Sequence, residues 1–174
     1  MRKVLIIQGS LNPKSKTAIV IREAEKILDS SNGIEFQTLD LRSFNMQFCD
    51  GRKLQEYNSD SQKAYDMVDK ADGLIIGMPV YCYSVSGPLK NFIDITSSAM
   101  EGKAVGIICT TGSSMSYLAS ADLAKILAYE SHVLSIHPVV CSSYVDFRNG
   151  RLVSQKGHEK LNNMIEVLVG FLKA

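Results

Sequence analysis

Short apolar runs alternate with amphipathic stretches along most of the chain. Nearly continuous apolar residues occupy positions 4–7, 74–78 and 104–109, and each run ends in a polar or glycine-containing segment, the second of them at Pro79. Between the runs, apolar side chains recur at helical spacing, first from Val20 to Leu28. Continuously apolar strands indicate a parallel sheet that is covered on both faces. The pattern therefore predicts alternating strands and helices of an α/β domain.

Weaker patterns complete the prediction. A second strand is predicted over Glu35–Asp40 and a fifth within Val133–Tyr144, where Pro138 favours a strand boundary or an edge position. A short hairpin is predicted around Asn149–Gly150. Residues 42–58 have weak periodicity and are interpreted as a long connection. Five strands in this length predict a doubly wound α/β sandwich.

Composition narrows the class of protein. A chain of 174 residues suits one domain, so a single domain over residues 1–174 is expected. The formal net charge of +1 creates no field for nucleic acid or an acidic membrane surface. No apolar run approaches the ~18 residues of a membrane-spanning helix, and the N-terminus turns polar too soon for a signal peptide. A cytoplasmic protein without nucleic-acid or membrane partners is expected.

Four cysteines are scattered along the chain: Cys49, Cys82, Cys109 and Cys141. They show neither CxxC nor Cys/His ligand spacing, so no metal site is expected. In a cytosolic protein they are interpreted as small buried hydrophobic residues or free thiols. Cys82 is disfavoured as a nucleophile because no base lies near it in the sequence.

A phosphate-binding loop is predicted after the first strand. Backbone N–H groups and the positive end of the next helix would face one spot there. Ser10, Ser15 and Thr17 could donate hydroxyl hydrogen bonds, and Lys14 or Lys16 could supply positive charge. Neither GxxxxGK[ST] nor GxGxxG is present, which favours a terminal phosphate monoester. The simpler alternative is a polar turn in which Ser15 or Thr17 caps the helix.

Two further loops follow strands. Pro79–Gly87 holds Tyr81 and Tyr83 with little charge, which suits a planar ring, although both could be ordinary aromatic residues. Ser86 is expected to cap the next helix. The segment Thr111–Ser114 has small residues that let the backbone approach a ligand, or it is a plain helix cap. Ligands of open parallel sheets bind at the carboxyl ends of the strands, so the three loops together predict one site.

With these loops in view, the chain resembles the NADPH-dependent FMN reductase family of flavodoxin-like fold. Within that family it is most similar to the reductases of two-component alkanesulfonate monooxygenase systems. The resemblance implies a five-stranded parallel sheet of order 2-1-3-4-5. It rests on Gly9-Ser10 with Ser15-Lys16-Thr17, on Ala71 to Ile75, on Pro79-Val80-Tyr81 with Ser86-Gly87 and Leu89-Lys90, and on Gly102-Lys103 with Thr111-Gly112 and Leu118.

The resemblance also implies roles for particular residues. Those that would hold the FMN phosphate are Ser10, Ser15, Lys16 and Thr17. Those that would flank the isoalloxazine ring are Pro79, Val80, Tyr81, Cys82, Tyr83 and Ser84, with Thr111, Gly112, Ser113 and Ser114 on its pyrimidine side. The chain departs from the family at Asn12 and Lys16, where arginine is frequent, and at Tyr117, where the alkanesulfonate-type enzymes often have histidine.

The expected function is that of an FMN-dependent NAD(P)H oxidoreductase. FMN would carry the chemistry, with NADPH or NADH as reductant, so no side chain is named as catalytic. The acceptor would be a small molecule such as free flavin, a quinone or an azo compound, and a flavin-dependent monooxygenase could be a partner. The family implies a homodimer or homotetramer. Related iron–sulfur flavoproteins carry a compact cysteine cluster in the second quarter of the chain, and this sequence has no such cluster there.

Two other functions remain open at this point. One is a flavodoxin-like electron carrier that binds FMN without a nicotinamide site. A balance of 19 basic and 18 acidic residues disfavours it, because carriers that dock to basic partners are expected to be acidic. The other is a catalytically silent nucleotide-binding module.

Overall fold

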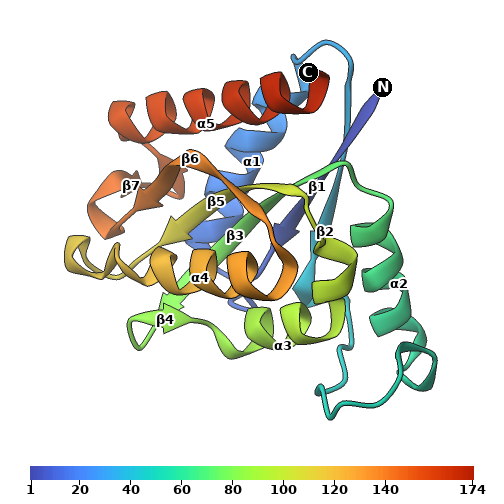
Figure 1. The fold of residues 1–174 in the computed structure, drawn as a ribbon. Coiled ribbons are helices and arrows are strands. Elements are labelled where there is room, and N and C mark those ends of the chain that lie inside the picture. The colour runs from blue at the N-terminus through green and yellow to red at the C-terminus, as the bar shows by residue number, and fades with distance from the viewer.

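The computed structural model describes residues 1–174, except for the side chain of Ser114. Five parallel strands form a twisted sheet in the order β2-β1-β3-β5-β6 (Figure 1). Taken in chain order, these five strands run 2-1-3-4-5, so the predicted arrangement is confirmed. A short strand that was not predicted, β4, pairs antiparallel with β3. The strands are β1 (Arg2–Gln8), β2 (Ile34–Asp40), β3 (Gly73–Tyr81), β4 (Ser84–Val85), β5 (Ala104–Thr110) and β6 (Leu134–Ser142).

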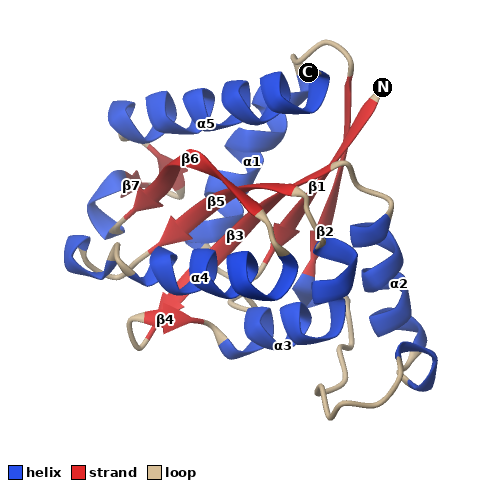
Figure 2. Ribbon diagram, viewed as in Figure 1, coloured by secondary structure: helices blue, strands red, loops and turns tan.

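Helices cover both faces of this sheet, as Figure 2 shows, which confirms the doubly wound sandwich. Helices α1 and α5 pack on one face, and α2, α3 and α4 pack on the other. None of the helices in the described chain is both long and apolar enough to cross a membrane. Their bounds are α1 (Lys16–Asp29), α2 (Ser59–Asp69), α3 (Gly87–Thr96), α4 (Ala119–Ser131) and α5 (Gln155–Lys173).

The double cover explains why the strands have continuously apolar sequences. Successive strand residues point to opposite faces of a sheet. In β3, Ile75 packs beneath α1 and α5, whereas Leu74 and Ile76 pack beneath the other three helices. All three side chains are fully buried. No position in the middle of such a strand faces water, so an alternating pattern cannot arise.

The structure shows where the third strand ends and where the last strand lies in the sheet. The prediction that the third strand stops at Pro79 is wrong, because β3 continues to Tyr81 and Pro79 is in register with Thr110 of β5. Proline lacks an N–H donor, but it is tolerated where the ladder is about to end. Strand β6 lies at the edge of the sheet, as Pro138 predicted.

The polar connections also take defined forms. The predicted hairpin around Asn149–Gly150 is confirmed, with β7 (Phe147–Arg148) paired antiparallel to β8 (Arg151–Leu152). The connection over residues 42–58 is long, as predicted, and single 3₁₀ turns lie at Leu41–Ser43 and Leu54–Glu56.

Candidate functional site

Three loops meet at the carboxyl edge of the sheet. They follow β1, β3 and β5, which are adjacent in the strand order. The Gly9 N–H donates a 2.9 Å hydrogen bond to the Gly77 carbonyl oxygen, and the Ser86 hydroxyl donates one of 3.4 Å to the Gly9 carbonyl oxygen. The first loop is therefore joined to β3 through the backbone and to the second loop through the Ser86 side chain. Ser86 occupies the N-cap position of α3 as predicted, although its hydroxyl makes this loop contact and no cap hydrogen bond.

Gly9 is required by this close approach. A Cβ atom at this position would lie 2.7 Å from the Gly77 carbonyl oxygen and 3.1 Å from both terminal methyl groups of Leu89. The first of these atoms belongs to the backbone of β3 and cannot rotate away. The absence of a side chain thus lets the first loop lie directly against β3 and the start of α3.

A buried glutamine shapes the first loop. The Gln8 side chain accepts a 2.7 Å hydrogen bond from the Ser10 N–H and donates one of 2.7 Å to the Ser10 carbonyl oxygen. It also donates to the Asp40 carboxylate at the end of β2. Burial raises the pKa of Asp40, but hydrogen bonds from Arg42 outweigh it and hold the pKa below its usual value. The sequence did not indicate this role of Gln8, because the residue is simply the last position of the first strand.

Helix α1 begins at the end of this loop. The Ser15 hydroxyl accepts a 3.1 Å hydrogen bond from the Ala18 N–H, so the capping role weighed for Ser15 is present. Lys16 is exposed, and its ammonium nitrogen lies 5.4 Å from the centre of the Phe147 ring in β7. The sequence did not predict this cation–π contact, because Lys16 and Phe147 are 131 positions apart in the chain. Apart from that of Ala18, the first N–H groups of α1 have no acceptor within the helix and remain available to an anion.

The first loop is also joined to the third. Thr17, in the first turn of α1, and Thr110, at the end of β5, hydrogen-bond to each other through their hydroxyl groups. Both residues are buried, with 1 % and 7 % of their surfaces exposed. The pair fixes the start of α1 over β5, the strand that leads into the third loop.

Replacing Thr17 by valine is expected to lower the free energy of unfolding by about 1–3 kcal/mol, because it leaves the buried Thr110 hydroxyl without its partner. The double variant Thr17→Val/Thr110→Val is expected to lose less than the sum of the two single variants. Urea denaturation of all four proteins measures the coupling. Strictly additive losses would mean that the two hydroxyls do not depend on each other.

The second loop is a tight hairpin and not an open loop. Tyr81 of β3 pairs with Ser84 of β4, and Cys82 and Tyr83 form the two-residue tip. Both tip residues have left-handed backbone, with φ angles of 50° and 60°. Two-residue hairpins need this conformation, but glycine and asparagine are its usual occupants. Each side chain here costs on the order of 1–3 kcal/mol, a strain that is typical of ligand sites.

Helix α4 holds the hairpin in place. The Ser84 hydroxyl donates a 2.8 Å hydrogen bond to the Asp122 carboxylate, in the first turn of α4. Sequence reasoning missed Asp122, which lies 38 residues further along the chain. An Asp122→Ala substitution is expected to destabilise the protein by about 1 kcal/mol and to weaken ligand binding at the hairpin. The Asp122→Asn variant keeps an oxygen acceptor and should stay close to wild type in denaturation and titration; equal losses in both variants would contradict the role assigned to the hydrogen bond.

The third loop is held against β6. The Thr111 N–H donates a 2.9 Å hydrogen bond to the Ser142 carbonyl oxygen, and the Thr111 hydroxyl donates one of 2.6 Å to the Ser113 carbonyl oxygen. Gly112 is exposed, with no atom within 4 Å of a Cβ placed there. The predicted side-chain role of Ser114 lies outside the described residues.

Large apolar side chains remain exposed on the segments that leave this edge. In the hairpin, Tyr81 is 50 % exposed and Tyr83 is 70 % exposed. Pro79 and Val80, on the same strand, are buried and half-buried. The other exposed members of the set are Leu11, Met115, Tyr117, Leu118, Tyr144 and Val145. Such surfaces mark ligand-binding or protein-binding faces.

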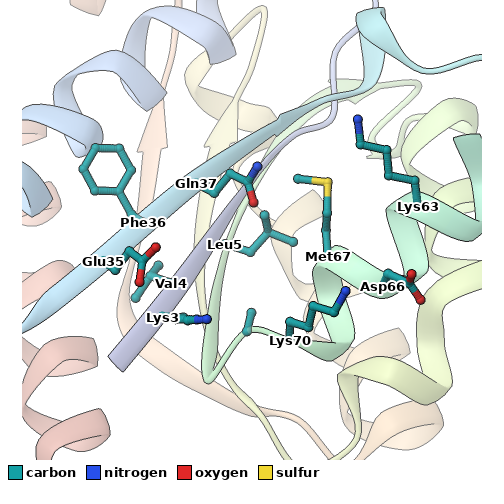
Figure 3. A pocket seen from close by; sticks show the side chains of 11 residues that line it. Lys3, Val4, Leu5, Glu35, Phe36, Gln37, Lys63, Asp66, Met67 and Lys70 are labelled. Carbon is teal, nitrogen blue, oxygen red and sulfur yellow. The ribbon is translucent and has the colours of Figure 1, made fainter. Parts of the chain in front are cut away.

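Two of the hollows in the surface differ in their position relative to the three loops. One of about 460 Å³ is mostly apolar and lies beside the first loop, between Leu11, Phe44 and Pro88. The other, of about 320 Å³, is shown in Figure 3; it lies between α2 and strands β1 and β2, with Lys3, Lys70 and Glu35 among its lining residues. The second hollow adjoins the early part of both strands and so lies away from the three loops.

Among the described residues, no group of three or more histidine, cysteine or acidic side chains could hold a metal ion. All four cysteines are free; Cys49 and Cys82 are exposed, Cys109 is buried and Cys141 is half-buried.

Known flavin reductases are similar to this chain in sequence and in structure. A sequence profile of the family described as NADPH-dependent FMN reductase matches residues 2–146. An NAD(P)H-dependent FAD/FMN reductase from Geobacillus thermodenitrificans is 35 % identical over 131 residues, which are 72 % of this chain and 69 % of the relative. The apo structure of an NADH:FMN oxidoreductase superposes with a TM-score of 0.81 at 25 % identity, covering 98 % of this chain and 90 % of the other. A flavodoxin from the domain Archaea gives a TM-score of 0.68 at 13 % identity with full coverage of both chains, which reflects a shared fold.

Proposed function

The chain belongs to the NADPH-dependent FMN reductase family, and we propose that the three loops at the carboxyl edge of its sheet bind FMN. The observation that carries the proposal is their convergence, with the open N-terminus of α1 at one end and the strained tyrosine hairpin at the other. When bound, FMN would supply the redox chemistry that links NADPH or NADH to a small-molecule acceptor.

The phosphate end of FMN fits the first loop. A phosphate at the N-terminus of α1 meets free N–H groups and the positive end of the helix dipole. Ser15 offers a hydroxyl group there and exposed Lys16 offers positive charge, whereas the Thr17 hydroxyl pairs with that of Thr110 and holds the start of the helix in place. Ser10 contributes through a loop that Gln8 holds in shape. Because Gly9 carries no side chain, the cofactor can lie close to the backbone that follows β1.

The ring end fits the second and third loops. Pro79 to Ser84 supply apolar and aromatic surface together with backbone groups, on a hairpin fixed by Asp122. Thr111, Gly112, Ser113 and Ser114 would face the pyrimidine edge from the other side. The protein orients the ring between these two walls and shields it from water; no side chain is assigned as an acid or base.

The exposed surface at this edge also carries a proposal about assembly. The exposed aromatic side chains at this edge would be covered by a second copy of the chain, forming a homodimer or tetramer that completes the cofactor site. A flavin-dependent monooxygenase as acceptor, the alkanesulfonate-type subfamily and a cytoplasmic location stay predictions from the sequence. Light scattering coupled to size exclusion tests the assembly.

One experiment separates the proposed enzyme from the electron carrier. The purified protein is titrated with FMN while flavin fluorescence is recorded, and NADPH or NADH is then added without oxygen. Binding followed by rapid bleaching of the visible flavin absorption is the expected result. Binding without bleaching would favour the carrier, and no binding would overturn the proposal.

A further inference from the structure

Two cysteines that are far apart in the sequence are neighbours in the sheet. Cys109 of β5 and Cys141 of β6 are paired in register on adjacent parallel strands. Adjacent strands are spaced about 4.8 Å apart, and disulfides bridge Cα atoms separated by about 4.4–6.8 Å. Both residues belong to the cluster beneath α2, α3 and α4, so their side chains leave the sheet on the same face.

The two thiols differ in environment. Cys109 is fully buried, whereas Cys141 is half-buried on the edge strand. A hydrogen bond from the Cys109 thiol lowers the pKa of Cys141; burial opposes this effect, while Ser120 of α4 and the positive charge of Lys160 in α5 add to it. The same contact, together with burial, raises the pKa of Cys109. Of the two thiols, Cys141 therefore loses its proton more readily.

We propose that Cys109 and Cys141 form a dithiol site that a hydroperoxide oxidises to an intramolecular disulfide. The inference does not depend on flavin binding. The proposed oxidant is hydrogen peroxide, and the nucleophile is the sulfur of half-buried Cys141.

The reaction takes place in two steps. The Cys141 thiol loses its proton to solvent; its sulfur attacks one peroxide oxygen, so that an S–O bond forms, the O–O bond breaks and hydroxide leaves and is protonated to water. The Cys109 thiol then gives up its proton, and its sulfur attacks the Cys141 sulfur; an S–S bond forms, the S–O bond breaks and a second water leaves. Two thiols lose two electrons in total, and one peroxide is reduced to two waters.

The sheet can accommodate this bond. The β5–β6 pairing shifts register between Gly106 and Ile108, just before Cys109, so the ladder is already irregular there. By contrast, Cys49 lies in the connection after β2 and Cys82 at the tip of the β3–β4 hairpin, both on the surface. Peroxide would oxidise these two separately.

Tryptic mapping of the full-length native protein tests the proposal. Cleavage after lysine and arginine places the four cysteines on four different peptides, at residues 43–52, 71–90, 104–125 and 126–148. The protein is reduced, freed of reductant, treated with hydrogen peroxide, then alkylated and digested without reduction. The expected product links peptide 104–125 to peptide 126–148, with a mass lower than their sum by two hydrogen atoms.

Two variants identify the roles of the sulfurs. In Cys141→Ser, the linked peptide should be lost and Cys109 should stay reduced at the same peroxide dose. In Cys109→Ser, Cys141 should accumulate as a sulfenic acid that dimedone traps. Circular dichroism checks that both variants are folded, and the wild-type result stands without them. Oxidation confined to Cys49 and Cys82, or a linked peptide that forms only after denaturation, would overturn the proposal.

Discussion

Replacing Ser15 by glycine and Lys16 by glutamine is expected to weaken FMN binding by on the order of 100-fold, which corresponds to about 3 kcal/mol. The change removes one hydroxyl donor and one positive charge from the N-terminus of α1, where charge-assisted hydrogen bonds to a phosphate would form. Glycine is chosen over alanine because it is tolerated at a helix N-cap with a loss of only a few tenths of a kcal/mol. Quenching of flavin fluorescence measures the affinity.

The N-terminus of α5 offers a matched control. Ser154 accepts a hydrogen bond of 3.1 Å from the Gly157 N–H, the same capping geometry and length that Ser15 shows with Ala18. A Ser154→Gly/Lys156→Gln variant therefore carries the same chemical change outside the three loops. It should bind FMN like the wild type. If both double variants lose affinity equally, or if neither does, the first loop does not hold the phosphate.

Replacing Gly9 by alanine is expected to lower the free energy of unfolding by about 1–3 kcal/mol and to weaken FMN binding tenfold or more (about 1.4 kcal/mol). The new methyl group would lie 2.7 Å from the Gly77 carbonyl oxygen, which is fixed in β3 and already accepts the Gly9 N–H. The first loop would have to move outward, and with it the groups assigned to the phosphate. Urea denaturation and FMN titration measure the two effects.

A glycine-to-alanine substitution at an uncrowded position tests whether the loss in Gly9→Ala comes from the steric clash at Gly9 or from alanine in general. Gly170 lies on α5 with no atom within 4 Å of a Cβ placed there. Gly170→Ala is expected to leave FMN binding unchanged and to stabilise the protein by up to about 1 kcal/mol, because alanine is the better helix former. Wild-type affinity in Gly9→Ala would show that the close approach of the first loop to β3 has no part in the site.

Local patterns determined the architecture because each strand and helix is defined by nearby residues. The apolar run ending at Gly77 and Met78 belongs to a strand buried on both faces, as its composition predicted. The predicted strand end at Pro79 is wrong. Proline lacks an N–H donor, which normally ends a strand, but Pro79 lies in the last pair of the β3–β5 ladder, where a missing donor is tolerated. Ser15 as a helix cap also followed from local chemistry.

Short-range spacing is enough to predict the α/β class, the order of elements, the carboxyl-edge loops and the family resemblance. It does not predict which distant groups meet in the folded chain. The Thr17–Thr110 hydroxyl pair, the Ser84–Asp122 hydrogen bond and the registered cysteines each join residues more than 30 positions apart. Such contacts depend on strand order and register, which arise when the whole sheet packs, so no sequence window contains them.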